Sequence, residues 1–243
     1  MKLIKLSAID STNDYLKKIS NESHLEDNTV VWAESQLQGR GQRDAIWHSE
    51  EGKSLTFSVF KCFSETKVLE QFSINCAVSI AVKKTLNRLG VNDIKIKWPN
   101  DIMAGNHKLG GILIENRLRE GSINNSIIGI GLNVNNTDFH NLPKAISLYQ
   151  HHGMKFEISE LISLLVEGIT AEIERLKAGG YENLKQDYET LLFRKDVITV
   201  FNDRNQVRFN GIVRGVTNDG QLRVETEDES INTFGLKEIE MLY

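Results

Sequence analysis

The chain has 243 residues and a formal net charge of −4, which argues against a dedicated nucleic-acid-binding protein, because such proteins usually carry a basic face. Hydrophobic residues make up 40% of the sequence, enough for a buried core, and charged residues 26%, as in ordinary globular proteins. The sequence has no apolar run of about 18 residues, which excludes a membrane-spanning helix, and it does not begin like a secretory signal. Cys62 and Cys76 lie in apolar patterns without CxxC spacing, so we expect core thiols in a cytoplasmic protein.

Segments typical of helices alternate with segments typical of strands up to residue 193. Asp10 or Ser11 can cap a first helix, whose apolar face carries Tyr15, Leu16 and Ile19. β-Branched or alternating sequences predict strands at 29–34, 54–60, 94–98, 109–116 and 126–134. Helical periodicity predicts further helices at 68–89, 159–177 and 183–193. The segment 39–53 has turn residues and no periodicity, which indicates a loop.

The sequence changes character after about residue 194. Short strands are predicted at 196–201, 207–216, 221–226 and 230–234, with a hairpin turn at Asn-Asp-Gly 218–220. Residues 195–243 hold six Lys or Arg against nine Asp or Glu, and an acidic barrel is a poor partner for DNA or RNA. We therefore predict an α+β fold, with a mixed sheet and helices over 1–193 and a small β-barrel over 194–243.

The first segment suited to ligand chemistry is Gly-Arg-Gly-Gln-Arg at 39–43, followed by Trp47. Its glycines expose backbone N–H groups beside the fixed positive charges of Arg40 and Arg43, which suits a phosphate or carboxylate. Taken alone, the segment is equally typical of a surface turn.

The second segment is Lys-Trp-Pro-Asn-Asp at 97–101, which follows an apolar strand. It places Asn100 and Asp101 at a strand end, where ligands usually gather. The Asp101 carboxylate has the oxygen chemistry that Mg²⁺ prefers. An ordinary Asn-Asp turn is the alternative.

Two further segments carry glycines inside strands. Lys108 immediately precedes the paired glycines of Lys-Leu-Gly-Gly-Ile-Leu-Ile-Glu at 108–115, where a ligand could approach the backbone, although a solvated lysine at a strand start is the alternative. Gly129 and Gly131 alternate within 128–134 and leave a flat surface on which a ring could lie. The GxGxxG spacing and following helix of a dinucleotide fold are absent, which excludes a Rossmann interpretation.

These segments follow Asp-Ser-Thr-Asn at 10–13 in one chain, and their order and spacing resemble the biotin protein ligase family. An STN segment, a GRG loop ending in Trp, KWPND, a KLGGIL segment and a GxGxN strand occur there in the same order. The most specific part is KWPND followed by KLGGILIE, which begins seven residues after Asp101. The resemblance covers nearly the whole chain and implies a catalytic domain like that of class II synthetases with an SH3-like C-terminal barrel.

The resemblance also implies roles for individual residues. Those implied to bind biotin are Ser11, Thr12, Asn13, Gln36, Gly39, Arg40, Lys108, Gly110 and Gly111. Those implied to bind ATP are Arg43, Trp47, Asn100 and Asn133. Lys108, Arg40 and Asp101 are the implied catalytic residues, and Asp101 is also the implied Mg²⁺ ligand.

The implied reaction consumes ATP to form biotinyl-5′-AMP and then transfers biotin to a lysine of a biotin carboxyl carrier protein. The biotin carboxylate must approach an anionic α-phosphate, and two unit charges about 4 Å apart repel by about 4 kcal/mol at an effective dielectric near 20. Arg40, Lys108 and Mg²⁺ can reverse the sign of this interaction.

The sequence departs from the family where Gln42 replaces a frequent arginine, whose charge an amide cannot supply, and where Ala45 replaces a basic residue. The chain resembles the shorter family form without an N-terminal DNA-binding domain, so we expect no DNA partner. A monomer and a homodimer stay equally open. The alternative functions are a lipoate or octanoate protein ligase and a biotin-sensing module without turnover.

Overall fold

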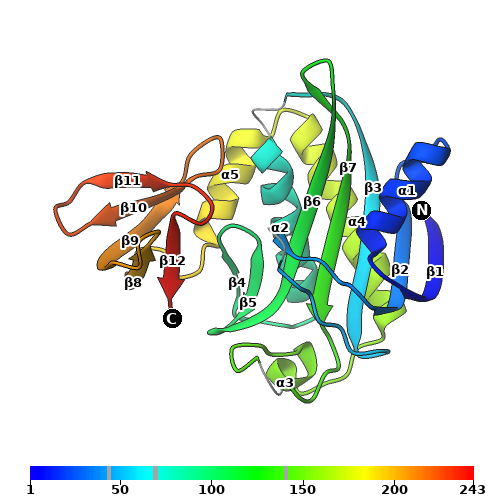
Figure 1. Ribbon diagram of the computed structural model, residues 1–243, viewed down its shortest axis with the longest axis horizontal. Helices are drawn as coiled ribbons and strands as arrows, with labels where there is room; N and C mark the ends of the chain where they lie inside the picture. Colours follow the sequence, from blue (N-terminus) through cyan, green and yellow to red (C-terminus); the bar gives the residue numbers. More distant parts are fainter. Residues whose placement is uncertain (43–44, 68–70, 140–141) are drawn as a thin grey trace.

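Two β-sheets organise the chain, and the computed structural model describes residues 1–42, 45–67, 71–139 and 142–243 (Figure 1). The larger sheet has seven strands in the order β1-β2-β3-β7-β6-β5-β4, and the smaller has five in the order β11-β10-β9-β8-β12. β1 and β2 are parallel, whereas the other neighbours pair antiparallel. The predicted α+β fold, a mixed sheet with helices followed by a small β-domain, is confirmed.

The strands of the large sheet are β1 (Lys2–Ile9), β2 (Thr29–Gln36), β3 (Ser54–Lys67), β4 (Ile94–Lys97), β5 (Asp101–Ala104), β6 (His107–Arg119) and β7 (Ser122–Asn133). The helices are α1 (Thr12–Glu22), α2 (Gln71–Arg88), α3 (Leu148–His152), α4 (Ile158–Lys177) and α5 (Tyr181–Thr190). The sequence did not predict the short elements β5 and α3. The helix predicted at 183–193 ends earlier, because the Phe193 backbone N–H donates to the carbonyl of Ile96 in β4.

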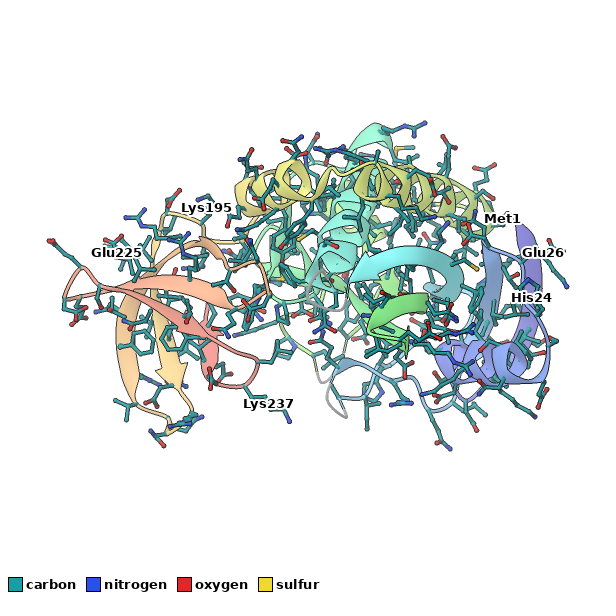
Figure 2. All side chains as sticks on the ribbon, turned by 90° about the horizontal axis from the view of Figure 1, so that it is seen from above. Met1, His24, Glu26, Lys195, Glu225 and Lys237 are labelled. Atoms are coloured by element: carbon teal, nitrogen blue, oxygen red, sulfur yellow. The ribbon has the colours of Figure 1, made fainter. Side chains whose placement is uncertain are left out.

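Alternation along the central strands separates an apolar face of the large sheet from a polar face. Leu55, Phe57 and Val59 of β3 join the main core, which α2 and α4 cover. The intervening Thr56 and Ser58 face the other side, as the sequence predicted. Seen from above, α4 and α1 lie on opposite faces of this sheet (Figure 2).

Helix α1 covers part of the polar face. Ser11 is its N-cap, with Oγ accepting from the Asp14 backbone N–H at 3.4 Å, so the predicted cap is confirmed. Leu16 is fully buried and packs with Val31 and Phe60 in a second, smaller core. The first turn of α1 therefore lies directly against the polar surface of β3 and β7.

Burial distinguishes the two cysteines. Cys76 lies in the core of α2, and burial raises the pKa of its thiol. Cys62 is only partly buried and packs against the edge of the second, smaller core, so the prediction of a core thiol holds there only in part. None of the described helices is long and apolar enough to cross a membrane.

The smaller sheet forms the C-terminal domain. Its strands are β8 (Ile198–Asp203), β9 (Arg208–Val216), β10 (Leu222–Thr226), β11 (Ile231–Phe234) and β12 (Ile239–Leu242). Phe201 is fully buried and its ring stacks on Phe209 at 5.6 Å. The domain boundary that we place at residues 193 and 194 falls between α5 and β8, and it stays an interpretation.

The β9–β10 turn anchors the barrel to the larger domain. The Trp98 indole N–H donates to the Gly220 carbonyl at 2.8 Å, and the Tyr181 hydroxyl donates to the Asn218 carbonyl at 2.7 Å. Gly220 has φ +89°, and a Cβ there would lie 2.4 Å from Cδ2 of Phe72. The turn thus requires glycine for both conformation and contact.

We expect Gly220→Ala to lower the free energy of unfolding by about 3 kcal/mol, of which about 1 reflects left-handed backbone strain and about 2 the overlap with Phe72. Gly179→Ala is the matched control, because Gly179 has φ +85° with open space around it, so it should lose about 1 kcal/mol only. Urea unfolding of both variants measures the difference. Equal losses would show that the turn does not depend on the Phe72 contact.

Candidate functional site

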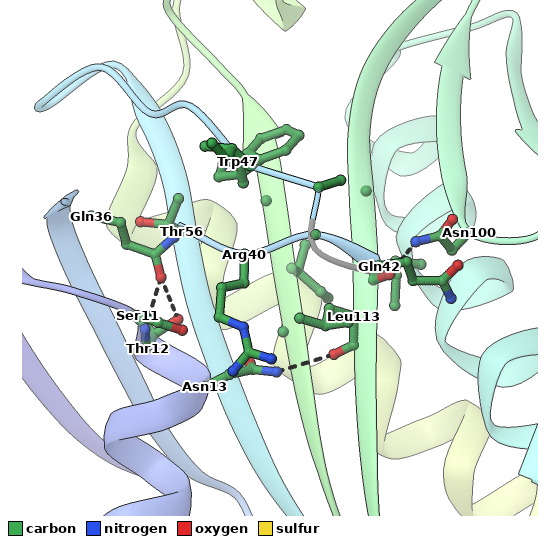
Figure 3. A pocket seen from close by; sticks show the side chains of 18 of the residues that line it. Ser11, Thr12, Asn13, Gln36, Arg40, Gln42, Trp47, Thr56, Asn100 and Leu113 are labelled. Carbon is green, nitrogen blue, oxygen red and sulfur yellow. Dashed lines mark hydrogen bonds between the residues drawn. The ribbon is translucent and has the colours of Figure 1, made fainter. Parts of the chain in front are cut away.

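A cavity of about 220 Å³ opens on the polar face of the large sheet, beside the first turn of α1 (Figure 3). Its walls come from α1, the end of β2, the segment after β2, and strands β3, β6 and β7. The predicted site residues that line it are Ser11, Thr12, Asn13, Gln36, Arg40, Trp47, Asn100, Asp101, Lys108 and Gly111. The fold therefore brings together side chains that are up to about a hundred residues apart in the sequence.

One end of the cavity is lined by uncharged polar groups. The backbone N–H of Thr12 donates to Oε1 of Gln36 at 2.8 Å, and the Thr12 hydroxyl oxygen lies 3.0 Å from the same atom. Ser11 and Thr12 are almost fully buried by the protein. This end offers hydroxyl and amide groups to a ligand that carries both donors and acceptors.

The other end of the cavity is charged. Nζ of Lys108 lies 2.6 Å from Oδ1 of Asp101, and Nζ of Lys97 lies 3.6 Å from Oδ2. The Lys108 side chain remains 38% exposed, so its ammonium is accessible from the cavity. Both oxygens of the single carboxylate therefore face lysines.

Arg40 lies at a different edge of the cavity, near Asn13 (Figure 3). Its Nη1 donates to Oδ1 of Asp14 on α1 at 2.7 Å, and its side chain is 49% exposed. An exposed ion pair of this kind contributes at most about 1 kcal/mol, so an anionic ligand can compete with Asp14 for the guanidinium.

The glycines of β7 receive side chains of the protein itself. A Cβ at Gly131 would lie 2.4 Å from Cε2 of Trp47, and a Cβ at Gly129 would lie 2.4 Å from Oδ1 of Asn13. The flat surface predicted from the alternating glycines is therefore occupied by the Trp47 indole. The Trp47 N–H is buried and has no hydrogen-bond partner among the described atoms, so it is available to a ligand.

Three predicted residues lie outside the lining of this cavity, and each has a structural contact. Gly39 accepts from the Trp47 backbone N–H at 2.8 Å and leaves room for the Trp47 carbonyl. Gly110 packs against Leu132, which a Cβ would overlap. Asn133 donates to the Ile146 carbonyl at 3.2 Å. Arg43, also predicted at the site, lies outside the described residues.

Asn100 lines the cavity but its side chain has a structural partner as well. Its Nδ2 donates to the Ile112 carbonyl at 2.7 Å, which holds the turn between β4 and β5 against β6. Asp101 is the first residue of β5, so it follows this turn directly. The strand end predicted here is in fact the tip of a β4–β5 hairpin.

A second cavity of about 670 Å³ meets the first one at Ile46, Trp47 and Lys108. Asn133, Lys144 and Tyr243 are among its other lining residues. The Lys144 ammonium lies 4.3 Å from the centre of the Tyr243 ring, and Lys97 lies 5.4 Å from it. Burial and the nearby Asp101 carboxylate raise the pKa of the Tyr243 hydroxyl.

Neither Lys144 nor Tyr243 was predicted from the sequence. Lys144 belongs to no motif, and it is placed by the backbone N–H of Lys108, which donates to its carbonyl at 2.6 Å. Tyr243 follows β12 of the barrel and reaches the cavity only through the docking of two domains. Such contacts between distant segments have no local pattern.

Comparison with protein families gives one match, to the biotin/lipoate A/B protein ligase family over residues 6–133. The chain belongs to this family. The matched segment begins in β1 and ends with β7, so it includes every predicted site residue. The predicted resemblance to biotin protein ligases is thereby confirmed, and so is the enzyme class, a ligase of this family.

Curated relatives of this chain are also ligases by name. The chain is 26% identical to the bifunctional ligase/repressor BirA of Escherichia coli over 226 residues, which cover 91% of this chain and 68% of that protein. It is 28% identical to BirA of Bacillus subtilis, covering 98% of this chain and 74% of that protein. Biotin–protein ligase 2 of Arabidopsis thaliana is 36% identical over 132 residues, 53% of this chain and 39% of that protein.

Solved structures of family members share the fold. Biotin protein ligase from Aquifex aeolicus in complex with biotin and ATP has a TM-score of 0.81 at 23% identity, covering 99% of this chain and 98% of that chain. The Leishmania major enzyme in complex with biotinyl-5-AMP has a TM-score of 0.64 at 17% identity, covering 96% and 98%. At these identities the likeness establishes the architecture, including the C-terminal barrel.

We expect Gly131→Ala to displace the Trp47 indole, because the added methyl would overlap the ring. The emission of Trp47, obtained as the difference from the same protein carrying Trp47→Phe, should shift to longer wavelength as the ring becomes hydrated. Gly111→Ala is the control, since a Cβ there has its nearest neighbours at 3.8 Å. An unshifted Gly131→Ala spectrum would contradict this packing.

Proposed function

We propose that this chain is a biotin protein ligase, which uses ATP to form biotinyl-5′-AMP and then transfers biotin to a lysine of an acceptor protein. The observation that carries the proposal is the meeting of two cavities at Lys108 and Trp47. One cavity has an uncharged polar end, and the other is large enough for a nucleotide. A reaction between two substrates needs this arrangement, in which both reacting ends meet beside a cation.

The polar end supports biotin over lipoate or octanoate. The ureido ring of biotin carries an N–H on each nitrogen and one carbonyl, which the hydroxyl of Thr12 and the amide of Gln36 can match. A dithiolane ring or an alkyl end would shield these groups from water without forming hydrogen bonds with them, at a cost of about 1–3 kcal/mol each. The family includes ligases of both kinds, so this polarity supports the choice within it.

The charged end supports catalysis over simple biotin sensing. A carboxylate oxygen of biotin attacks the α-phosphorus of ATP and forms an O–P bond, while the bond from the α-phosphorus to the bridging oxygen breaks and pyrophosphate leaves. Lys108 lies at the junction of the cavities and can neutralise both anions as they approach. Arg40 is proposed to contribute its charge from the α1 side after it releases Asp14.

The nucleotide is proposed to occupy the second cavity, against Trp47, Asn133 and Tyr243. Trp47 forms part of both cavities, so its ring would separate the biotin and adenosine parts of the intermediate. In the second step the acceptor lysine amine attacks the acyl carbonyl and AMP leaves. Exclusion of water from this junction would protect the mixed anhydride from hydrolysis.

Mg²⁺ fits this site as a companion of the nucleotide. Among the described residues, no group of three or more His, Cys, Asp or Glu is placed to hold a metal. Asp101 supplies one carboxylate beside Lys108, and Mg²⁺ is usually bound by one or two carboxylates together with substrate phosphates. Asp101 is therefore the proposed protein ligand, and the ion would supply further neutralisation of the phosphates.

The acceptor is proposed to be a biotin carboxyl carrier protein. A relative from Paracoccus denitrificans, 28% identical over 129 residues, is named biotin–[acetyl-CoA-carboxylase] ligase. DNA is not a proposed partner, although two relatives are named ligase/repressor, because the chain has a net charge of −4.

The test is biotin-dependent exchange of labelled pyrophosphate into ATP. The wild-type protein should catalyse exchange with biotin and not with lipoate. Lys108→Ala should lower the exchange rate by at least about 100-fold, because it removes a charge that neutralises the transition state. Lys18→Ala, an exposed change on α1, is the control and should retain full activity. A folded wild-type protein without biotin-dependent exchange would refute the proposal.

A further inference from the structure

Beneath the polar end of the cavity, a row of hydrogen-bonding groups, buried at its centre and partly exposed at its two ends, crosses from β6 to β2. It begins at Glu115, whose Oε2 accepts from Nδ2 of Asn13 at 2.9 Å. Oδ1 of Asn13 lies 2.6 Å from the hydroxyl of Ser58, which in turn lies 2.7 Å from the hydroxyl of Thr12. The row ends at Oε1 of Gln36, 3.0 Å from the Thr12 hydroxyl. Ser58 is fully buried and Asn13 nearly so.

Two arrangements of protons are compatible with these distances, because Ser58 has one proton and two oxygens within reach. In the first, Ser58 donates to Thr12 and Thr12 donates to Gln36, which leaves Oδ1 of Asn13 without a proton. In the second, Ser58 donates to Asn13, and Thr12 turns its hydroxyl proton to Ser58. The second arrangement satisfies Asn13. It leaves the hydroxyl oxygen of Thr12 and Oε1 of Gln36 facing each other without a proton between them, while Oε1 still accepts from the Thr12 backbone N–H at 2.8 Å.

Glu115 selects between the two arrangements. A carboxylate only accepts hydrogen bonds, so Nδ2 of Asn13 points toward it and Oδ1 points toward Ser58. The Leu113 carbonyl accepts from the same Nδ2 at 3.5 Å, a longer bond that supports this orientation (Figure 3). Lys17 lies 3.4 Å from Oε1 of Glu115 and pairs with its negative charge. Gly129 lets Asn13 approach this closely, because a Cβ there would overlap Oδ1. Oδ1 therefore faces Ser58 and requires its proton.

We propose that Glu115 and Ser58 are positioning residues that set the hydrogen-bond polarity of the cavity, so that it requires an N–H donor from the ligand. In the selected arrangement a ligand N–H can point between the oxygens of Thr12 and Gln36, which lie 3.0 Å apart. This inference rests on the proposed function and deepens it, because it assigns the donor preference of the cavity to two residues that do not line it. Neither residue touches the ligand in this scheme, and both act through Asn13 and Thr12.

The experiment measures KM for biotin, and for two biotin analogues in which one or the other ureido N–H is replaced by oxygen, in pyrophosphate exchange. For the wild-type protein, KM should be about tenfold higher or more for one analogue than for biotin. The ring oxygen of that analogue would face the oxygens of Thr12 and Gln36, which are also acceptors. Glu115→Gln should raise KM for biotin by about fivefold, leave kcat within about twofold, and reduce the discrimination. Glu115→Asp keeps an acceptor-only group and should retain more of the discrimination than Glu115→Gln.

Ser58→Ala should act in the same way and more strongly, since it removes the proton donor of Asn13. Ser126→Ala is the matched control, because Ser126 is also a fully buried serine of this sheet, and it donates to Oδ1 of Asn116 at 2.6 Å outside the cavity. The control should keep the wild-type KM and discrimination. The double variant Glu115→Gln/Ser58→Ala should be no worse than Ser58→Ala, because both act through one row of hydrogen bonds.

The outcomes separate the two proposals. A wild-type protein without biotin-dependent exchange contradicts the proposed function. The wild-type protein can instead catalyse biotin-dependent exchange while Glu115→Gln and Ser58→Ala both keep its discrimination between biotin and the analogues. That result overturns the assignment of Glu115 and Ser58. Additive effects in the double variant overturn it as well. Should Ser58→Ala unfold, Glu115→Gln decides alone, because Glu115 is partly exposed and its replacement keeps the same shape.

Discussion

The two glycines of β7 set the distance at which other segments approach the polar face of the sheet, and the site depends on that distance. Gly129 admits Asn13 of α1 and Gly131 admits the Trp47 indole, each to within contact of the strand backbone. A side chain at either position would lift α1 or the segment after β2 away from β3. The polar end of the cavity, the junction with the second cavity and the row from Glu115 to Gln36 would then lose their geometry together.

The cations of the site are held by carboxylates of the protein. Arg40 pairs with Asp14, and Lys108 pairs with Asp101. Such pairs keep long side chains in place at little net energy while they are partly exposed. A substrate anion that replaces the carboxylate meets a cation already positioned, so less side-chain entropy is lost when it binds.

The sequence predicted the fold class and most elements because hydrophobic periodicity and capping are local. The N-cap Ser11, the alternation along β3 and the hairpin at 218–220 are all such features. The KWPND and KLGGIL motifs predicted that Asp101 and Lys108 belong to one site, and the two residues do lie together, on the adjacent strands β5 and β6.

What the sequence did not reveal depends on pairing between distant segments. Ser58 and Glu115 belong to ordinary strand sequences, and only the register of β3, β7 and β6 places them under Asn13. Gly110 looked like a ligand contact, yet its missing side chain makes room for Leu132 on the neighbouring strand. Tyr243 reaches the second cavity through the docking of the barrel, which no local pattern records.

The indole of Trp98, two residues before Asn100, is tied to the β9–β10 turn, and Tyr243 of the same barrel forms part of the wall of the second cavity. The barrel and the cavity are therefore thermodynamically linked. If docking of the barrel strengthens binding of an occupant through Tyr243, the bound occupant stabilises the docked barrel by the same free energy, because linkage is reciprocal. The C-terminal domain thus reports on the occupancy of a site that lies largely outside it.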